Sequence, residues 1–235
     1  MDYLGVVPVE FSYFCLVKKT LIYYYVPYAV LLVAMLAALS VYPKAELHLW
    51  LNSCHTPLGD TFLRLYSQLA EWPLYVIAAL PLVFKRWRLT VWYAASELVS
   101  ATIVWVLKQL FHAPRPAAYF ENIPDAVLPV VEGVRLHHSN SFPSGHTATF
   151  FVLFTFCALL LAHYYTTHES DRRFSATWRR LAMLLLLVMA ALGGYSRIYL
   201  SQHFLSDVCV GSPIGVIVPT VIFALFSNRI TRPNR

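Results

Sequence analysis

Three short stretches of the sequence combine side chains that could bind and cleave a phosphate ester. The stretches are "KQLFHAPRP" (108–116), "SFPSGHTA" (141–148) and "SRIYLSQHFLSD" (196–207). Lys108, Arg115 and Arg197 are cations that can neutralise phosphoryl oxygens, and the two arginines offer forked donors to a pair of them. The stretches therefore predict a phosphate site, provided that the fold brings them together.

Two histidines in these stretches are suited to different tasks. His203 and Asp207 are four residues apart, about 40° around a helix, so the carboxylate can hold one ring nitrogen protonated and leave the other as a nucleophile. His146 has no carboxylate at that spacing and could protonate a leaving oxygen as a general acid. Arg197 lies roughly 120° from His203 around an ideal helix, so one straight helix would point them apart. We therefore expect a helix that ends near Tyr199, followed by a short break.

The stretch "PSGHTA" has the composition of a helix start. A proline fits the first turn of a helix, which predicts that Ser144, Gly145 and His146 lie at the helix N-terminus. Backbone N–H groups and the helix dipole make such an end a ready anion site.

The three stretches resemble the signature of the type 2 phosphatidic acid phosphatase (PAP2) superfamily, whose pattern is KxxxxxxRP, PSGH and SRxxxxxHxxxD. This chain carries the complete pattern in order, from Lys108 to Asp207. The resemblance extends over about residues 40–228 of what we expect to be a single domain, 1–235. The stretch "SQHFLSD" lacks the glycine and proline that many relatives carry around the histidine, which bears on the substrate.

The resemblance implies phosphate hydrolysis without a metal, through a covalent phosphohistidine. It implies that His203 is the nucleophile, that Asp207 orients it, and that His146 is the acid for the leaving group and then the base for water. The residues that would bind the phosphate are Lys108, Arg115, Ser144, Gly145 and Arg197.

The composition indicates that the elements carrying these residues lie in a membrane. Of the 235 residues 58% are hydrophobic and 13% are charged, against about a quarter charged in soluble domains. We predict an all-α fold with six helices long enough to cross ~30 Å of hydrocarbon, near residues 21–42, 61–84, 89–111, 145–166, 181–199 and 205–227. The second is the least obvious, because its first half carries a polar stripe that includes Asp60, Arg64 and Glu71.

The distribution of Lys and Arg predicts the orientation. Six crossings put both termini on one side, and twelve of the eighteen Lys and Arg residues fall on that side. The positive-inside rule then makes the termini cytoplasmic. The predicted localisation is the cytoplasmic membrane, with the three stretches facing the periplasm or cell exterior.

Other readings of these residues are weaker. The histidines show no HExxH pair and no Cys or carboxylate cluster at zinc-ligand spacing, so we expect no metal and no cofactor. The basic residues do not gather on a soluble stripe for nucleic acid. A lone histidine at a membrane interface is more often solvated than functional, which applies to His137 and His138. For Glu97 a structural pairing with a Tyr hydroxyl or a neighbouring helix is favoured over a proton path.

These observations predict an integral membrane lipid phosphatase that acts on a phosphomonoester or pyrophosphate of an envelope lipid. Candidate substrates are lipid A, undecaprenyl diphosphate, phosphatidylglycerol phosphate and phosphatidic acid. Two alternatives remain open. A phosphotransferase of the same fold would pass the phosphoryl group to another lipid, and a non-enzymatic transporter or scaffold would need related halves with interrupted spans, which the sequence does not display. The oligomeric state is left open.

Overall fold

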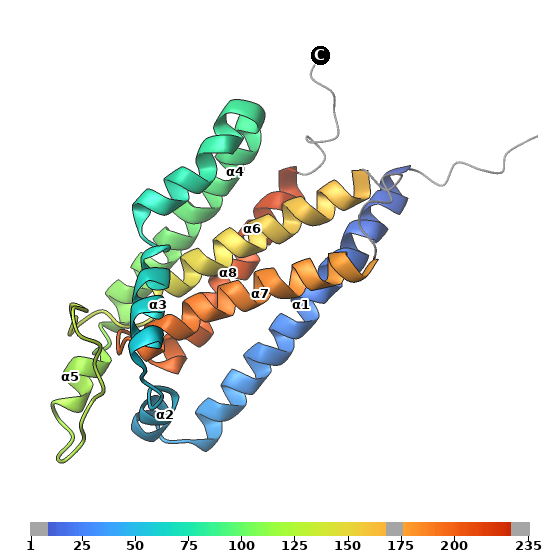
Figure 1. Cartoon of the computed structure of the whole chain (residues 1–235). Helices are drawn as coiled ribbons and strands as arrows, with labels where there is room; N and C mark the ends of the chain where they lie inside the picture. The colour runs from blue at the N-terminus through green and yellow to red at the C-terminus, as the bar shows by residue number, and fades with distance from the viewer. Residues whose placement is uncertain (1–8, 168–175, 227–235) are drawn as a thin grey trace, which may run out of the picture.

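The chain folds into helices joined by short connections and one long loop (Figure 1). The computed structural model describes residues 9–167 and 176–226, with side chains for 19–71, 87–165 and 176–226. Within these residues there is no strand, so the predicted all-α class is confirmed. The helices are α1 (Val9–Val41), α2 (Lys44–Leu51), α3 (Pro57–Gln68), α4 (Trp72–Phe111), α5 (Pro116–Phe120), α6 (Gly145–Thr167), α7 (Ala176–Tyr199) and α8 (Leu205–Phe226).

Five segments of the described residues are long and apolar enough to cross a membrane. They are Lys19–Val41, Trp87–Phe120, Gly145–Tyr165, Ala176–Tyr199 and Leu205–Phe226. The prediction of six spans is not confirmed. The expected second span, 61–84, falls on α3, on a break at residues 69–71, and on the first part of α4, where most side chains lie outside the described residues.

Helix α3 has 12 residues, which makes it too short to cross ~30 Å of hydrocarbon. The Thr56 hydroxyl caps it by accepting a hydrogen bond from the Gly59 N–H at 3.0 Å, as expected of an N-cap threonine. Leu63 and Tyr66 are buried, whereas Phe62 and Leu65 are exposed. One face of α3 therefore covers the protein and the other faces outward.

Helix α4 turns back on itself. Glu71, directly before α4, and Lys108, near its end, both interact electrostatically with Arg197. A straight helix of 40 residues would hold its ends about 60 Å apart. The reversal visible in Figure 1 returns the end of α4 to the region where α3 ends.

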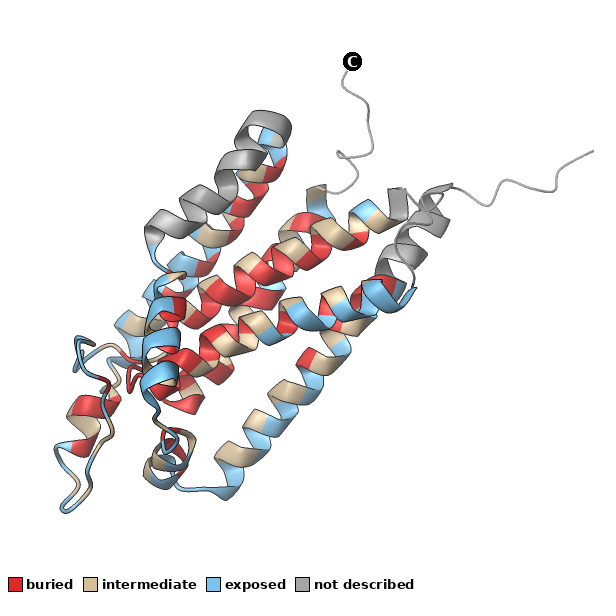
Figure 2. Cartoon of the chain, viewed as in Figure 1, coloured by how far each residue is buried: buried red, intermediate tan, exposed pale blue. Residues whose placement is uncertain are grey.

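Helix α6 is the centre of the bundle and packs against α1, α4, α7 and α8. Figure 2 shows buried residues along α6 and α8, and many exposed ones on α1 and α3. Tyrosine hydroxyls of α1 bind hydroxyls of the central helices: Tyr24 lies 2.9 Å from Thr155 of α6, and Tyr25 lies 2.7 Å from Thr220 of α8. These bonds satisfy polar groups where hydrocarbon offers no partner.

The end of α4, the start of α6 and the α7–α8 connection gather at one end of the bundle. Figure 1 shows α2 and α5 at this end as well, and the starts of α1 and α7 at the other end. The three stretches singled out from the sequence are therefore brought together.

Candidate functional site

The connection between α7 and α8 is a tight loop built on the carbonyl of Arg197. This oxygen accepts hydrogen bonds from the backbone N–H groups of Gln202, at 2.9 Å, and His203, at 3.1 Å. Helix α7 ends at Tyr199 and α8 begins at Leu205, which confirms the predicted break. Arg197 and His203 are thus held side by side although a continuous helix would separate them.

The side chain of His203 is held by a buried carboxylate. Its Nδ1 lies 3.2 Å from Asp207 Oδ2, and both residues are 1% exposed. The same oxygen accepts the Ser141 hydroxyl at 2.5 Å and the Phe204 backbone N–H at 3.1 Å. An ionised carboxylate only accepts hydrogen bonds, so Nδ1 carries the proton and Nε2 keeps its lone pair.

The protonation of His203 fits this assignment. Burial lowers the pKa of His203, the hydrogen bond that His203 donates to Asp207 acts in the opposite direction, and the charge of Arg115 lowers the pKa further. The imidazole is therefore neutral at neutral pH, and a neutral ring with a free lone pair can act as a nucleophile.

Arg115 ties the loop before α6 to the α7–α8 connection. Its Nε donates to the carbonyl of Ser139 at 3.0 Å. Its Nη1 donates to the Gln202 carbonyl at 3.2 Å and to Gln202 Oε1 at 3.1 Å. The guanidinium is half-buried, and its second terminal nitrogen has no hydrogen bond to the described residues.

Helix α6 begins at Gly145 with Ser144 as its N-cap. The Ser144 hydroxyl accepts the Thr147 N–H at 3.3 Å and the Thr147 hydroxyl at 2.8 Å. The expectation that the proline occupies the first turn is wrong, because Pro143 precedes the cap. Ser144, Gly145 and His146 nevertheless lie at the helix N-terminus as predicted, where the first N–H groups have no helical acceptor.

Arg197 and Lys108 supply two further cations at this end. Arg197 is 8% exposed, its Nη1 donates to the Ser67 hydroxyl, and its Nε has no partner within the described residues. The charges of Lys108, Arg115 and Arg197 all act on His146. The eight residues predicted for the site therefore occupy one region.

A cavity of about 210 Å³ opens beside these residues. Its walls come from α3, the loop before α6, the start of α6 and the end of α7, and consist of Arg64, Ser67, Gln68, Glu71, Gly133, Val134, Arg135, His137, His146, Arg197, Leu200 and Gln202. Among the predicted residues only His146 and Arg197 line the cavity. The other six are not among its lining residues.

Three residues that position the predicted ones were missed by the sequence analysis: Ser141 binds Asp207, Gln202 binds Arg115, and Ser67 binds Arg197. Ser67 belongs to the polar stripe in the first half of the second predicted span, but the sequence gives it no role there. Ser141 and Gln202 carry no periodic or spacing signal, because their contacts depend on how loops approach each other.

His137, His138 and Glu97 were also considered from the sequence, and the structure shows what each of them contacts. His138 is exposed, with Nε2 3.2 Å from Glu121 Oε1. His137 lines the cavity, and burial followed by the charge of Arg115 lowers its pKa. Glu97 lies beside Tyr93 and Thr149 of α6, in keeping with a structural pairing. Across the described ranges, no group of three or more His, Cys, Asp or Glu side chains could hold a metal ion.

Comparison with known proteins places this arrangement in a family. A family model described as PAP2 superfamily matches residues 89–231. Human dolichyldiphosphatase 1 is 27% identical over 179 residues, covering 75% of this chain and 70% of the relative. Lipid A 4'-phosphatase of Porphyromonas gingivalis is 26% identical over 187 residues, covering 78% of this chain and 72% of the relative.

Two crystal structures share the fold. LpxE from Aquifex aeolicus superposes with a TM-score of 0.60 at 24% identity, over 78% of this chain and 97% of LpxE. A transmembrane PAP2 type phosphatidylglycerolphosphate phosphatase from Bacillus subtilis gives a TM-score of 0.59 at 20% identity, over 90% of this chain and the whole of that chain.

The family model covers more than half of the chain, which therefore belongs to the PAP2 superfamily. It is a multi-pass membrane protein of the PAP2 lipid phosphatases, which are phosphoric ester hydrolases.

Proposed function

We propose that the chain hydrolyses a phosphomonoester or pyrophosphate of an envelope lipid through a phosphohistidine intermediate at His203. The observation that carries this proposal is the environment of His203. Asp207 and Ser141 hold Nδ1 in its protonated form, and the carbonyl of Arg197 fixes the backbone. Nε2 is the nitrogen left with a lone pair.

In the proposed reaction, His203 Nε2 attacks phosphorus, and the bond from phosphorus to the leaving oxygen breaks. His146 gives a proton to that oxygen. Water then attacks the phosphorus of the phosphohistidine while His146 takes a proton from the water, and the bond to Nε2 breaks to release phosphate. The two steps together return His146 and His203 to the state that the next cycle needs.

Phosphate binding is proposed for the cations and for the start of α6. Lys108, Arg115 and Arg197 act electrostatically on His146, and Arg115 and Arg197 also act on His203. Three positive charges suit the oxygens of a phosphoryl group in transfer. Gly145 and the Ser144 end of α6 would add the positive end of the helix dipole. No metal or other cofactor takes part in this scheme.

The substrate class is proposed from the membrane setting and the relatives. The relatives are named for dolichyl diphosphate and lipid A, and both names denote a phosphate on a lipid. The test is a phosphate-release assay of the purified protein against lipid A, undecaprenyl diphosphate, phosphatidylglycerol phosphate and phosphatidic acid. Release from at least one of them is expected, with or without chelator. Transfer of phosphate only to an acceptor lipid would favour a phosphotransferase instead.

The nucleophile is tested by His203→Ala and by trapping. We expect this variant to insert normally and to lose turnover, and we expect the wild type to form an acid-labile, base-stable phosphoenzyme that the variant does not form. Vanadate, which mimics a five-coordinate phosphoryl group, should inhibit. Substantial turnover by His203→Ala would exclude His203 as the nucleophile.

We also propose that the site faces the periplasm or cell exterior and that both termini are cytoplasmic. The distribution of Lys and Arg along the sequence, with twelve of the eighteen assigned to the side of the termini, supports this orientation. Cys54 offers a natural probe, because it is exposed in the α2–α3 loop at the site's end. A membrane-impermeant maleimide should label it in intact cells, with Cys54→Ser as the control. Labelling only after lysis would reverse the proposed orientation.

A further inference from the structure

A second cavity, of about 180 Å³, lies between α1 and α7 at the end of the bundle opposite the site. Ala176, in its wall, is the first residue of α7, whereas Arg197 lies near the last turn of the same helix. The two cavities are therefore separated by most of the thickness of the membrane, about 30 Å along the helix. The lining residues are Lys19, Thr20, Tyr23, Ala176, Arg179 and Arg180.

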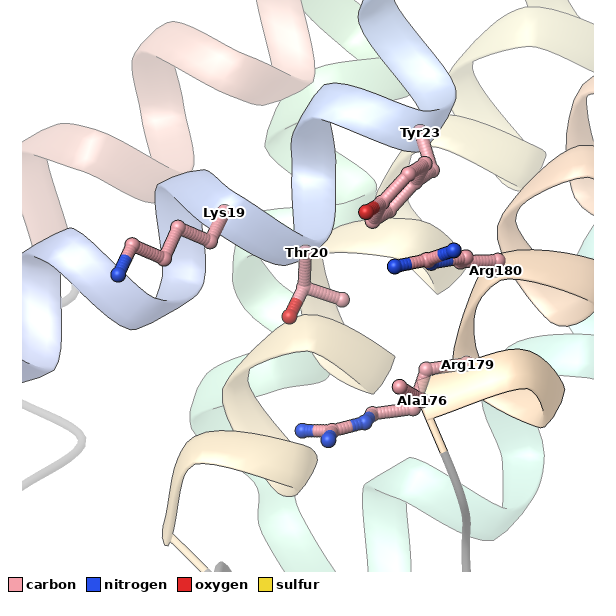
Figure 3. A pocket seen from close by; sticks show the side chains of 6 residues that line it. All are labelled: Lys19, Thr20, Tyr23, Ala176, Arg179 and Arg180. Carbon is pink, nitrogen blue, oxygen red and sulfur yellow. The ribbon is translucent and has the colours of Figure 1, made fainter.

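The cavity is strongly basic. Figure 3 shows the guanidinium group of Arg180 to the right of the Thr20 side chain and that of Arg179 below it, while Lys19 extends away to the left. The guanidinium carbon of Arg180 lies 4.9 Å from the centre of the Tyr23 ring. None of the three cations pairs with a carboxylate among the side chains that the structure describes. Two guanidinium groups that no described carboxylate neutralises favour a bound anion.

The surface next to the cavity is apolar and exposed. From the cavity toward the middle of the bundle, exposed apolar residues follow on both helices: Ile22 and Val26 on α1, and Leu181, Leu185 and Val188 on α7. Trp178, which is 63% exposed, lies at the same level as the arginines, as aromatic residues do at a membrane interface. An anion in the cavity would therefore border directly on lipid chains.

We propose that this cavity binds the phosphate of an anionic membrane phospholipid, in the leaflet opposite the one that the proposed active site faces. Basic pockets between transmembrane helices on the cytoplasmic side bind such head groups. Arg179 and Arg180 supply charged donors, and the start of α7 adds the positive end of its dipole. A lipid held here bridges α1 and α7. This proposal does not depend on the reaction at the other end of the molecule.

The test measures lipid affinity of the full-length protein in a neutral detergent, by native mass spectrometry and by thermal unfolding. The probes are phosphatidylglycerol, phosphatidylcholine and inorganic phosphate. The pocket variant is Arg180→Gln and the matched control is Arg88→Gln. Arg88 is an exposed arginine whose guanidinium carbon lies 5.7 Å from the centre of the Trp87 ring, so both substitutions remove one charge and one contact with an aromatic ring.

We expect wild type and Arg88→Gln to bind phosphatidylglycerol more tightly than phosphatidylcholine, and Arg180→Gln to bind phosphatidylglycerol at least about fivefold more weakly, since one Lys or Arg near an anionic surface contributes ~1 kcal/mol. Arg179→Gln should behave in the same way without disturbing Tyr23. All variants keep the site at the other end intact, so lipid bound there contributes equally to each measurement.

Three results would overturn the proposal. Equal weakening by Arg180→Gln and Arg88→Gln would mean that only the general surface charge acts. Equal affinity for phosphatidylglycerol and phosphatidylcholine would mean that the phosphate is not selected by charge. Binding of inorganic phosphate that is sensitive to Arg180→Gln, together with lipid binding that is not, would make this a site for a soluble anion.

Discussion

Helices α6 and α8 meet at Gly211, and replacing this residue with alanine tests whether their spacing sets the geometry of the site. A methyl group on Gly211 would lie 2.5 Å from the carbonyl oxygen of Ser144, whereas ordinary contacts begin at 3.4 Å. The obstacle is backbone, so no side chain can turn aside. That carbonyl accepts the Ala148 N–H at 3.2 Å, and the Ser144 N–H donates to the carbonyl of Asp207 at 3.1 Å. The substitution therefore pushes apart the two elements that carry His146 and Asp207.

The size of the effect follows from the 0.9 Å by which the 2.5 Å contact falls short of the 3.4 Å at which ordinary contacts begin. A displacement of about 1 Å between reacting groups can lower a rate ~100-fold, which corresponds to about 2.7 kcal/mol of transition-state free energy. Crowding a packed interface lowers the free energy of unfolding by ~1–3 kcal/mol. We expect Gly211→Ala to lose about two orders of magnitude in kcat/KM and to unfold at a moderately lower temperature.

The assay is phosphate release from short-chain phosphatidic acid, or from whichever lipid of the panel is hydrolysed, run well below the unfolding temperature of each variant. The matched control is Gly194→Ala. Its methyl group would meet Val208 Cγ1 at 3.1 Å and Thr147 Cγ2 at 3.3 Å, and these side-chain atoms can yield by a few tenths of an ångström. Wild-type kcat/KM in Gly211→Ala, or an equal loss in Gly194→Ala, would refute the reasoning.

Four further substitutions test His48, the pair of Asp60 and Tyr199, and Arg197. Burial lowers the pKa of His48 from 6.5 to about 4, so between these pH values the unfolded chain takes up a proton that the folded chain does not. The free energy of unfolding should therefore fall by roughly 3 kcal/mol as the pH drops from 6.5 to 4. Thermal unfolding of His48→Phe should show a flatter pH dependence than that of the wild type. The Tyr199 hydroxyl donates a hydrogen bond to Asp60 at 2.6 Å and lowers the pKa of this carboxyl group. The stability that this bond contributes above pH 4 should be lost as the pH falls through the lowered pKa of Asp60. The effects of Asp60→Asn and Tyr199→Phe on the free energy of unfolding should not add. Arg197→Lys keeps the charge but loses the forked donors, so kcat/KM should fall at least ~10-fold while membrane insertion is unchanged.

The parts of the fold that were predictable are those governed by long apolar runs and short spacings. The break after Tyr199 followed from the angle between Arg197 and His203, and the start of α6 followed from the run Ser144 to His146. The region 61–84 was harder to predict because its two halves belong to different helices. Its first half is a capped amphipathic helix that covers the cavity through Ser67, whereas its second half belongs to α4. The bond between Ser141 and Asp207 could not be predicted, since it joins a loop to a helix 66 residues away.

The spacing of His203 and Asp207 has a different physical origin from the helical face that suggested it. Helix α8 begins at Leu205, so Phe204 is its N-cap and Asp207 is its third residue. The Asp207 carboxylate accepts the N–H of the cap, as an acidic residue does in a capping box, and the histidine lies one residue before the cap. The same oxygen therefore fixes the start of α8 and orients His203. Asp207→Asn must weaken both, whereas Ser141→Ala removes only a bond from outside the helix. Comparing the two variants by unfolding and by kcat/KM separates the capping of α8 from the orientation of the imidazole, and Ser141→Ala should lower kcat/KM more than its effect on unfolding implies.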